Sequence, residues 1–194
     1  MGLPLQVKIL LVDKNRHSIR LSGYDYSTSG WYFVTICVQN RECLFGEIID
    51  FVGADPRVRP EREMELNNIG AMIQKWVEKI PYKFGGVNLD ESIVMPNHIH
   101  FIVVTKNHRI GQTHGSAPTL GKIVQWFKTM TTNEYLRNVK TIHWPMVDKR
   151  LWQRNYYEHI IRNENELNKI RAYIQDNPAN WARDEENPQQ SFLR

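Results

Sequence analysis

Apolar residues in this chain follow strand spacing in some stretches and helix spacing in others. A continuous β-branched and aromatic run covers 31–38, and two further runs at 91–95 and 98–104 flank a Pro-Asn turn. Residues 44–48 and 152–162 have room for short additional strands. Because near-continuous apolar strands are buried on both faces of a sheet, we predict that 31–38 is a central strand.

Three segments have apolar residues three and four positions apart, which is typical of amphipathic helices. The first runs from Glu61 to Ile80, the second follows Thr119, and the third follows Asn163 and ends near Asp176. Thr119 and Asn163 are residue types that favour the N-cap position. Pro178 ends the third helix, since the residue before proline disfavours helical backbone.

The order of these elements is strand, helix, strand pair, helix, strand, helix. This order predicts an α+β fold in which helices pack on an antiparallel sheet, ferredoxin-like in type. A chain of 194 residues is long enough for one domain, which we place at 20–181. Residues 1–19 show no sustained period and end in a basic, polar stretch, and residues 182–194 are mostly polar, so we expect an N-terminal arm and a C-terminal tail.

Composition and charge narrow the classes of protein without naming one. Hydrophobic residues make up 41% and charged residues 24%, as in ordinary globular proteins. We see no apolar run long enough to span a bilayer and no leader pattern, so we expect a cytoplasmic protein without a membrane partner. The net charge of +4 permits a phosphate-bearing partner. Cys37 and Cys43 are too few for a zinc knuckle, and we expect free thiols.

Two pairs of residues carry candidate chemistry. His98 and His100 alternate with Ile99 in a predicted strand, so both imidazoles point to one face, where they are suited to a divalent metal or to ordinary hydrogen bonding. Tyr173 and Asn177 are four residues apart and share one side of the third helix. Periodicity alone favours a packing role for Tyr173 and a helix-ending role for Asn177.

The motifs occur together in a recognisable order. They are Met95-Pro96-Asn97-His98-Ile99-His100, Trp152-Gln153, Glu158-His159-Ile160-Ile161-Arg162 and Tyr173-Ile174-Gln175-Asp176-Asn177-Pro178. With the segments 24–36 and 41–47, they resemble the single-tyrosine HUH transposases. The sequence is most similar to the branch associated with repetitive extragenic palindromes (REP) in bacterial genomes, and the resemblance covers about residues 20–181.

The resemblance implies a fold of the HUH endonuclease type and a role for each matched residue. His98 and His100 would bind a divalent metal, Mg²⁺ or Mn²⁺, with Asn177 as the third ligand. Tyr173 would be the nucleophile that forms a 5′-phosphotyrosine link. The expected activity is cleavage and rejoining of single-stranded or hairpin DNA at the nucleoid of a bacterial cytoplasm, by a monomer or a homodimer.

A cluster of aromatic and basic residues before the third helix is a candidate DNA contact. The aromatic rings would stack on bases and the arginines would contact phosphates, although the rings also suit a core strand. The cluster comprises Trp152, Arg154, Tyr156, Tyr157 and Arg162.

Two other functions compete with a transposase. One is a non-catalytic module that binds single-stranded nucleic acid through the aromatic residues of an RNA-recognition-like sheet, although the basic-Gly-aromatic signature of such modules is absent. The other is a metalloenzyme acting on small molecules, which would need a carboxylate at facial-triad spacing that we do not find. We rank the metalloenzyme last.

Overall fold

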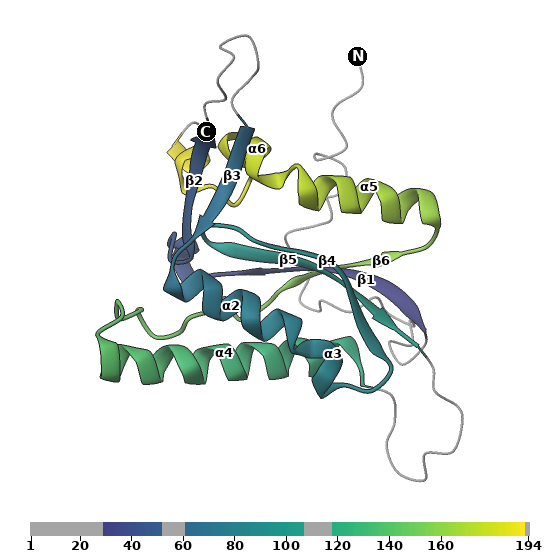
Figure 1. The fold of residues 1–194 in the computed structure, drawn as a ribbon, viewed down its shortest axis with the longest axis horizontal. Coiled ribbons are helices and arrows are strands. Elements are labelled where there is room, and N and C mark those ends of the chain that lie inside the picture. Colours follow the sequence, from purple (N-terminus) through teal and green to yellow (C-terminus); the bar gives the residue numbers. More distant parts are fainter. Residues whose placement is uncertain (1–28, 52–60, 107–117, 193–194) are drawn as a thin grey trace.

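A four-stranded antiparallel sheet forms the centre of the computed structural model, which describes residues 29–51, 61–106 and 118–192 (Figure 1). The strands of this sheet are β1 (Gly30–Cys37), β4 (Val87–Val94), β5 (His98–Thr105) and β6 (Tyr157–Ile161). Their order is β4-β5-β1-β6, with antiparallel pairing throughout. The central place predicted for residues 31–38 and the antiparallel α+β fold are confirmed.

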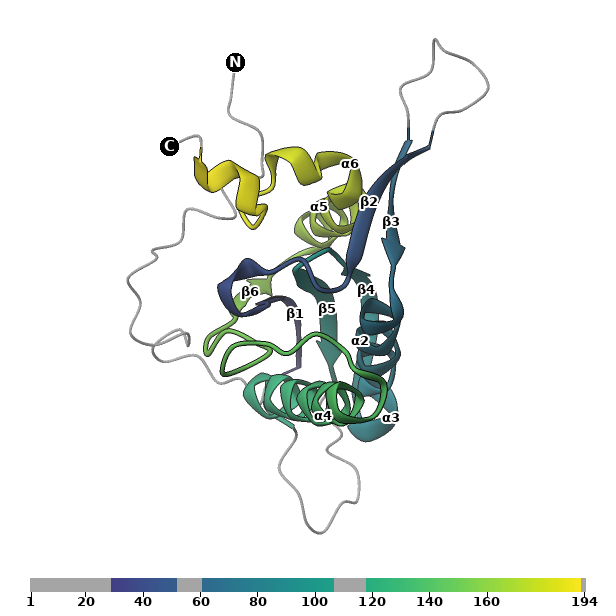
Figure 2. The ribbon, with the colours of Figure 1, turned by 90° about the vertical axis from the view of Figure 1, so that its left-hand side faces the viewer.

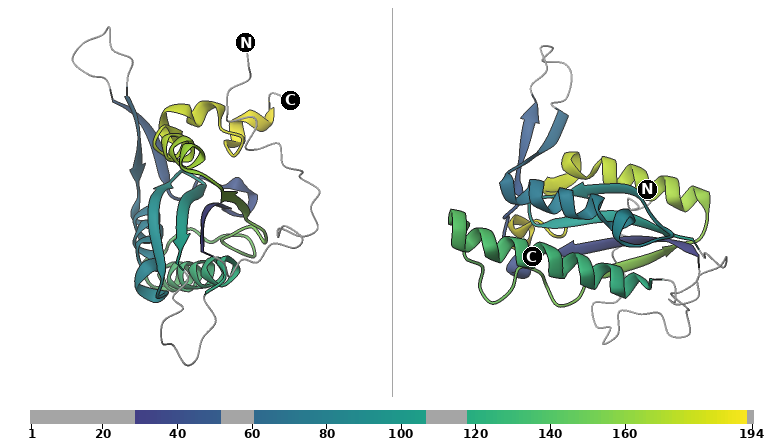
Figure 3. Two further views of the ribbon diagram at one scale, coloured as in Figure 1. Left: turned by 90° about the vertical axis from the view of Figure 1, so that its right-hand side faces the viewer. Right: turned by 60° about the horizontal axis from the view of Figure 1, so that its bottom comes forward.

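Helices cover both faces of the sheet (Figures 1 and 3). The helices α2 (Asn68–Glu78), α3 (Ile80–Lys83) and α4 (Leu120–Ile142) lie on one side, and α5 (Glu164–Gln175) lies on the other. Strand alternation sends Val34 into the larger core with α2 and α4, while Phe33 joins the smaller core under α5. Within the described part of the chain, no helix is both long and apolar enough to cross a bilayer.

The two predicted N-caps are confirmed. The Thr119 hydroxyl accepts a hydrogen bond from the backbone N–H of Lys122 (3.4 Å), and the Asn163 side chain accepts one from the N–H of Glu166 (2.9 Å). Each cap satisfies an N–H group that has no partner inside the helix.

The prediction of a helix over 61–80 is wrong for its first six residues, which form a strand. Strand β3 (Glu61–Leu66) pairs with β2 (Gly46–Phe51) in a ribbon that extends away from the body of the molecule (Figure 2). Met64 and Leu66 are two residues apart, which is strand spacing, whereas helix spacing begins only after them. Helix α2 follows Asn67, whose side chain accepts hydrogen bonds from two backbone N–H groups of its first turn.

The prediction of a C-terminal tail at 182–194 also needs correction. After α6 (Asn177–Asn180) come two 3₁₀ turns, η2 (Trp181–Arg183) and η3 (Pro188–Phe192). Between them Glu186 pairs with Arg41 at 2.8 Å, and Asn187 is buried with its amide donating to the Trp181 carbonyl. Polar contacts, which leave no hydrophobic period in the sequence, hold this segment in place. The expected arm at 1–19 lies outside the described residues.

Candidate active site

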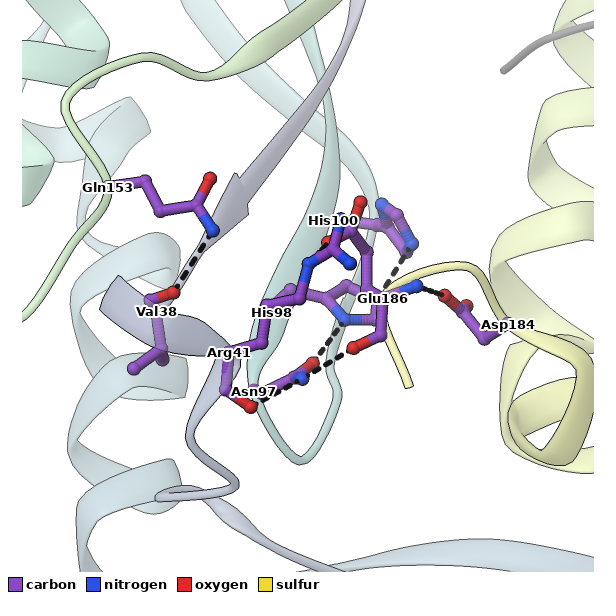
Figure 4. Close-up of polar contacts among 8 residues, drawn as sticks. All are labelled: Val38, Arg41, Asn97, His98, His100, Gln153, Asp184 and Glu186. Carbon is purple, nitrogen blue, oxygen red and sulfur yellow. Dashed lines mark hydrogen bonds and ion pairs between the residues drawn. The ribbon is translucent and has the colours of Figure 1, made fainter. Parts of the chain in front are cut away.

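Strand β5 presents two buried histidines on the sheet face that lies under α5. Ile99 and Phe101 point into the larger core, so His98 and His100 point the other way. The two imidazoles are 0% and 3% exposed, and their Nε2 atoms are 3.0 Å apart (Figure 4). Both rings therefore direct a nitrogen at the same small region.

A hydrogen bond to the other ring nitrogen orients each imidazole. The Asn97 side-chain amide donates to the carbonyls of Arg41 (3.0 Å) and Glu186 (2.7 Å), so its oxygen faces His98 Nδ1 at 2.9 Å. That oxygen can only accept, which places the proton of neutral His98 on Nδ1 and leaves the Nε2 lone pair available. Thr35 Oγ1 lies 2.8 Å from His100 Nδ1. Partners of this kind orient metal-binding histidines in proteins.

Both imidazoles are neutral at physiological pH. Burial lowers the pKa of His98 to about 3, with a further contribution from the positive charge of Arg41. Burial also lowers the pKa of His100 well below its ordinary value, and His98 adds to this effect. A neutral imidazole is the form that binds metals, so neither residue has to lose a proton first.

Asp184 completes a possible ligand set that sequence reasoning missed. One ligand atom each from His98, His100 and Asp184 lie within 4.8 Å of one another. Burial raises the pKa of the Asp184 carboxyl, while a hydrogen bond from the Glu186 backbone N–H (2.7 Å) lowers it. No periodicity marked this residue, because it comes from the polar segment after η2.

A divalent metal fits these residues. Two imidazole nitrogens and a carboxylate oxygen are ordinary ligands for such ions. The side-chain oxygen of Asn177 is buried and accepts no hydrogen bond, as expected for an atom that coordinates a cation. His98, His100, Asp184 and Asn177 could therefore hold a metal between them.

Tyr173 borders the same centre from α5. Its hydroxyl lies 3.5 Å from His100 Nε2, and its ring packs edge-on against Phe33 with centroids 6.0 Å apart. Burial raises the pKa of Tyr173, the negative charge of Asp184 raises it further, and a hydrogen bond with Asn177 lowers it. The phenol is thus protonated at neutral pH, and its use as a nucleophile requires help in losing the proton.

The free cysteines add no sulfur ligand to the centre. Cys37 is the register partner of His98, and Cys43 is exposed. Burial and the nearby Glu186 carboxylate raise the pKa of the Cys37 thiol, so it remains protonated and poorly suited to binding a metal.

The predicted DNA-contact cluster divides into core and surface residues. Trp152 belongs to the core, because it is 4% exposed and its indole N–H donates to the Thr131 hydroxyl at 2.8 Å. The prediction that its ring stacks on bases is therefore wrong. Tyr156 and Tyr157 are half-buried and pack against the larger and the smaller core respectively.

The two arginines of that cluster remain available for DNA contacts. Arg154 and Arg162 are exposed, one before β6 and the other directly after it. Their guanidinium groups are accessible to a phosphate backbone, so these two contacts stay predictions.

Comparison with known proteins identifies the family. The family model described as "Transposase IS200 like" matches residues 60–177, which include His98, His100, Tyr173 and Asn177. The chain belongs to the IS200-like transposases. The match ends before Asp184, so that residue lies outside the part that the family model describes.

One related protein and one solved structure add to this comparison. An uncharacterised protein of Haemophilus influenzae is 37% identical over 184 residues, covering 88% of this chain and 92% of that protein. A solved structure of a REP-associated tyrosine transposase bound to a REP hairpin superposes with a TM-score of 0.53 at 18% identity. That alignment covers 82% of this chain and 73% of the solved chain, and it shows a shared fold.

Proposed function

We propose that this IS200-like transposase cleaves and rejoins single-stranded or hairpin DNA through a covalent bond between DNA and Tyr173. The observation that carries the proposal is the 3.5 Å approach of the Tyr173 hydroxyl to His100 Nε2, within a centre formed by two neutral imidazoles and Asp184. Membership of the transposase family supports a DNA substrate.

His98, His100 and an oxygen of Asp184 or Asn177 would hold the divalent metal. When bound, such an ion neutralises the charge that develops on the attacked phosphate. Mg²⁺ and Mn²⁺ are the proposed ions. Of the two, Mn²⁺ suits a site with two nitrogen ligands better. All these ligands come from one chain, so a monomer already contains a complete set.

Tyr173 would attack in line with the bond that breaks. Its oxygen loses a proton and forms a bond to phosphorus, while the 3′ oxygen leaves and takes up a proton to become a free hydroxyl. The 5′-phosphotyrosine retains the energy of the broken diester. A 3′-hydroxyl from another DNA end can then reverse the step and join the strands without ATP.

REP hairpins are the proposed substrate because of the solved transposase with the same fold, which is bound to a REP hairpin. Arg154 and Arg162 would contact the phosphate backbone, and Tyr157 lies on the same sheet face as the histidines. The sheet itself is a poor stacking surface, since helices cover both faces and Phe101 is fully buried. This counts against a non-catalytic module that binds through sheet aromatics.

The test uses labelled single-stranded hairpins from the flanks of the chain's own gene, with Mg²⁺ or Mn²⁺, followed by denaturing gels. We expect a covalent protein–DNA band that disappears in Tyr173→Phe, in His98→Ala and with a chelator. Tyr82→Phe is the matched control, because Tyr82 is 90% exposed and belongs to α3 on the opposite side of the sheet. Tight DNA binding without any covalent band would favour the binding module.

A further inference from the structure

Helix α5, which carries Tyr173, has two polar connections to the edge strand β4. Arg171 donates to both carboxylate oxygens of Asp90, from Nε at 2.7 Å and from Nη2 at 2.6 Å. One helical turn later, the Gln175 amide donates to Glu91 at 3.3 Å. Bidentate arginine–carboxylate pairs are both strong and directional, so the first connection restricts the orientation of the helix.

An irregularity in β4 makes these two connections possible. Leu89 pairs with Val103 and Ser92 pairs with Phe101, so Asp90 and Glu91 lie together opposite a single residue of β5. In a regular strand, neighbouring side chains point to opposite faces. The bulge lets two consecutive acidic residues reach the same helix, and bulges commonly redirect side chains near active sites.

The connections lie on the flank of α5 opposite Tyr173. Ile170 and Ile174 form the buried stripe against the sheet. At about 100° per residue, Arg171 and Gln175 project to one side of this stripe, toward β4, and Tyr173 projects to the other. Rotation of the helix about its axis would therefore carry the phenol toward or away from His100, and apolar contacts alone resist such rotation weakly because they are non-directional.

We propose that the Asp90–Arg171 pair, presented by the β4 bulge, is a positioning device that sets the rotation of α5 and holds the Tyr173 phenol at the metal centre of its own chain. The inference rests on the proposed function, in which Tyr173 is the nucleophile. The side chain of Arg171 hydrogen-bonds to Asp90 and Asn168, which are neither proposed metal ligands nor the phenol, so the effect of the pair passes through the helix.

A second polar side-chain contact on α5 provides a matched control. Glu166, in the first turn, lies 2.7 Å from His159 Nε2 and also accepts from the Arg162 backbone N–H (2.8 Å). It ties the same helix to β6, about two turns from Tyr173. A general loss of helix docking would follow from either Arg171→Gln or Glu166→Gln, whereas a loss of Tyr173 positioning would follow from Arg171→Gln alone.

The experiment measures the rate of covalent-adduct formation at saturating hairpin DNA, together with Mn²⁺ affinity. Arg171→Gln should slow adduct formation by about tenfold to a hundredfold, the effect of a misplaced nucleophile, with Mn²⁺ affinity retained. Glu166→Gln should stay within about threefold of the wild-type rate. The reversed pair Asp90→Arg with Arg171→Asp should recover part of the lost rate. A wild-type rate in Arg171→Gln, or equal slowing in both single variants, would overturn the proposal.

Amide hydrogen exchange without DNA separates this proposal from the proposed function. Arg171→Gln should accelerate exchange in 170–176, and Glu166→Gln should do so only in the first turn of α5. Absence of an adduct in the wild-type protein counts against the tyrosine chemistry, and the exchange pattern then still decides whether the pair holds the helix. Unchanged exchange in 170–176 would refute the positioning role.

Discussion

Asp184→Asn should weaken metal binding while leaving the metal-free protein at least as stable. Burial raises the pKa of Asp184 above its unfolded value, so the stability from this group is present at low pH and is lost as the pH rises through the folded pKa. At pH 7 its ionised form is therefore a cost in the absence of metal. Asparagine removes the charge and keeps an oxygen that can accept from the Glu186 N–H.

The magnitude follows from binding linkage. At a Mn²⁺ concentration of about 100 times the dissociation constant, a bound ion stabilises the wild-type protein by about 2.7 kcal/mol. If loss of the charged ligand weakens Mn²⁺ affinity about tenfold, the same Mn²⁺ concentration stabilises the variant by only about 1.4 kcal/mol. For a chain of this size, about 1 kcal/mol shifts the melting temperature by roughly 2–4 °C. The metal-induced shift should thus fall by about half.

The assay is thermal unfolding in chelator and in Mn²⁺, with calorimetric titration for the dissociation constant. Glu185→Gln is the control. This variant removes the neighbouring charge, and Glu185 itself supplies no atom to the cluster of potential ligands. Asn177→Ala tests the other oxygen. Wild-type Mn²⁺ affinity in Asp184→Asn, combined with a loss in Asn177→Ala, would refute the reasoning and assign the oxygen ligand to Asn177.

Three further predictions concern stability. The folded pKa of His98 is about 3, below its unfolded pKa. The contribution of neutral His98 to the free energy of unfolding is therefore complete above the unfolded pKa, and it falls as the pH drops below that value. Metal-free wild-type protein should lose about 1.6 kcal/mol relative to His98→Gln between pH 6.5 and 5 in urea unfolding, and a constant difference would contradict this. Trp152→Ala should lower the free energy of unfolding by about 3–5 kcal/mol, because it removes a ring from the core. The folded fraction of this variant should bind DNA normally. A selective loss of DNA affinity would instead support base stacking by Trp152. Gly70→Ala should destabilise the α2 docking, because a Cβ there would lie 2.1 Å from the Phe45 carbonyl oxygen, and an unchanged urea midpoint would disprove that close approach.

The parts of the site that the sequence reveals are those set by local periodicity. Strand alternation is sufficient to place His98 and His100 on one face, and the four-residue spacing brings Tyr173 and Asn177 to one side of their helix. Their roles in catalysis remain proposals. The resemblance of the ordered motifs, rather than any single residue, was needed to predict the family.

Long-range polar contacts were not predictable in this way. Asp184 reaches the histidines because polar contacts hold the segment after η2: an ion pair, a hydrogen bond from Asn97 to the Glu186 carbonyl, and one from the Glu186 N–H to the Asp184 carboxylate. None of these contacts produces a hydrophobic pattern. Trp152 was misassigned since an aromatic beside an arginine has the same sequence pattern in a core and at a DNA surface. Glu61–Leu66 was misassigned because two apolar residues are too few to separate strand from helix spacing.

The side chain of Asn97 joins three segments that are made at different times during synthesis. It contacts Arg41, His98 and Glu186, so the last support of the His98 ring arrives long after the ring itself. At ordinary translation rates, Asp184 is added roughly 4–17 s after His98. A nascent chain therefore contains both histidines before it contains either the tyrosine or the carboxylate. On the proposed chemistry, chains that stop before Tyr173 would be unable to cut DNA.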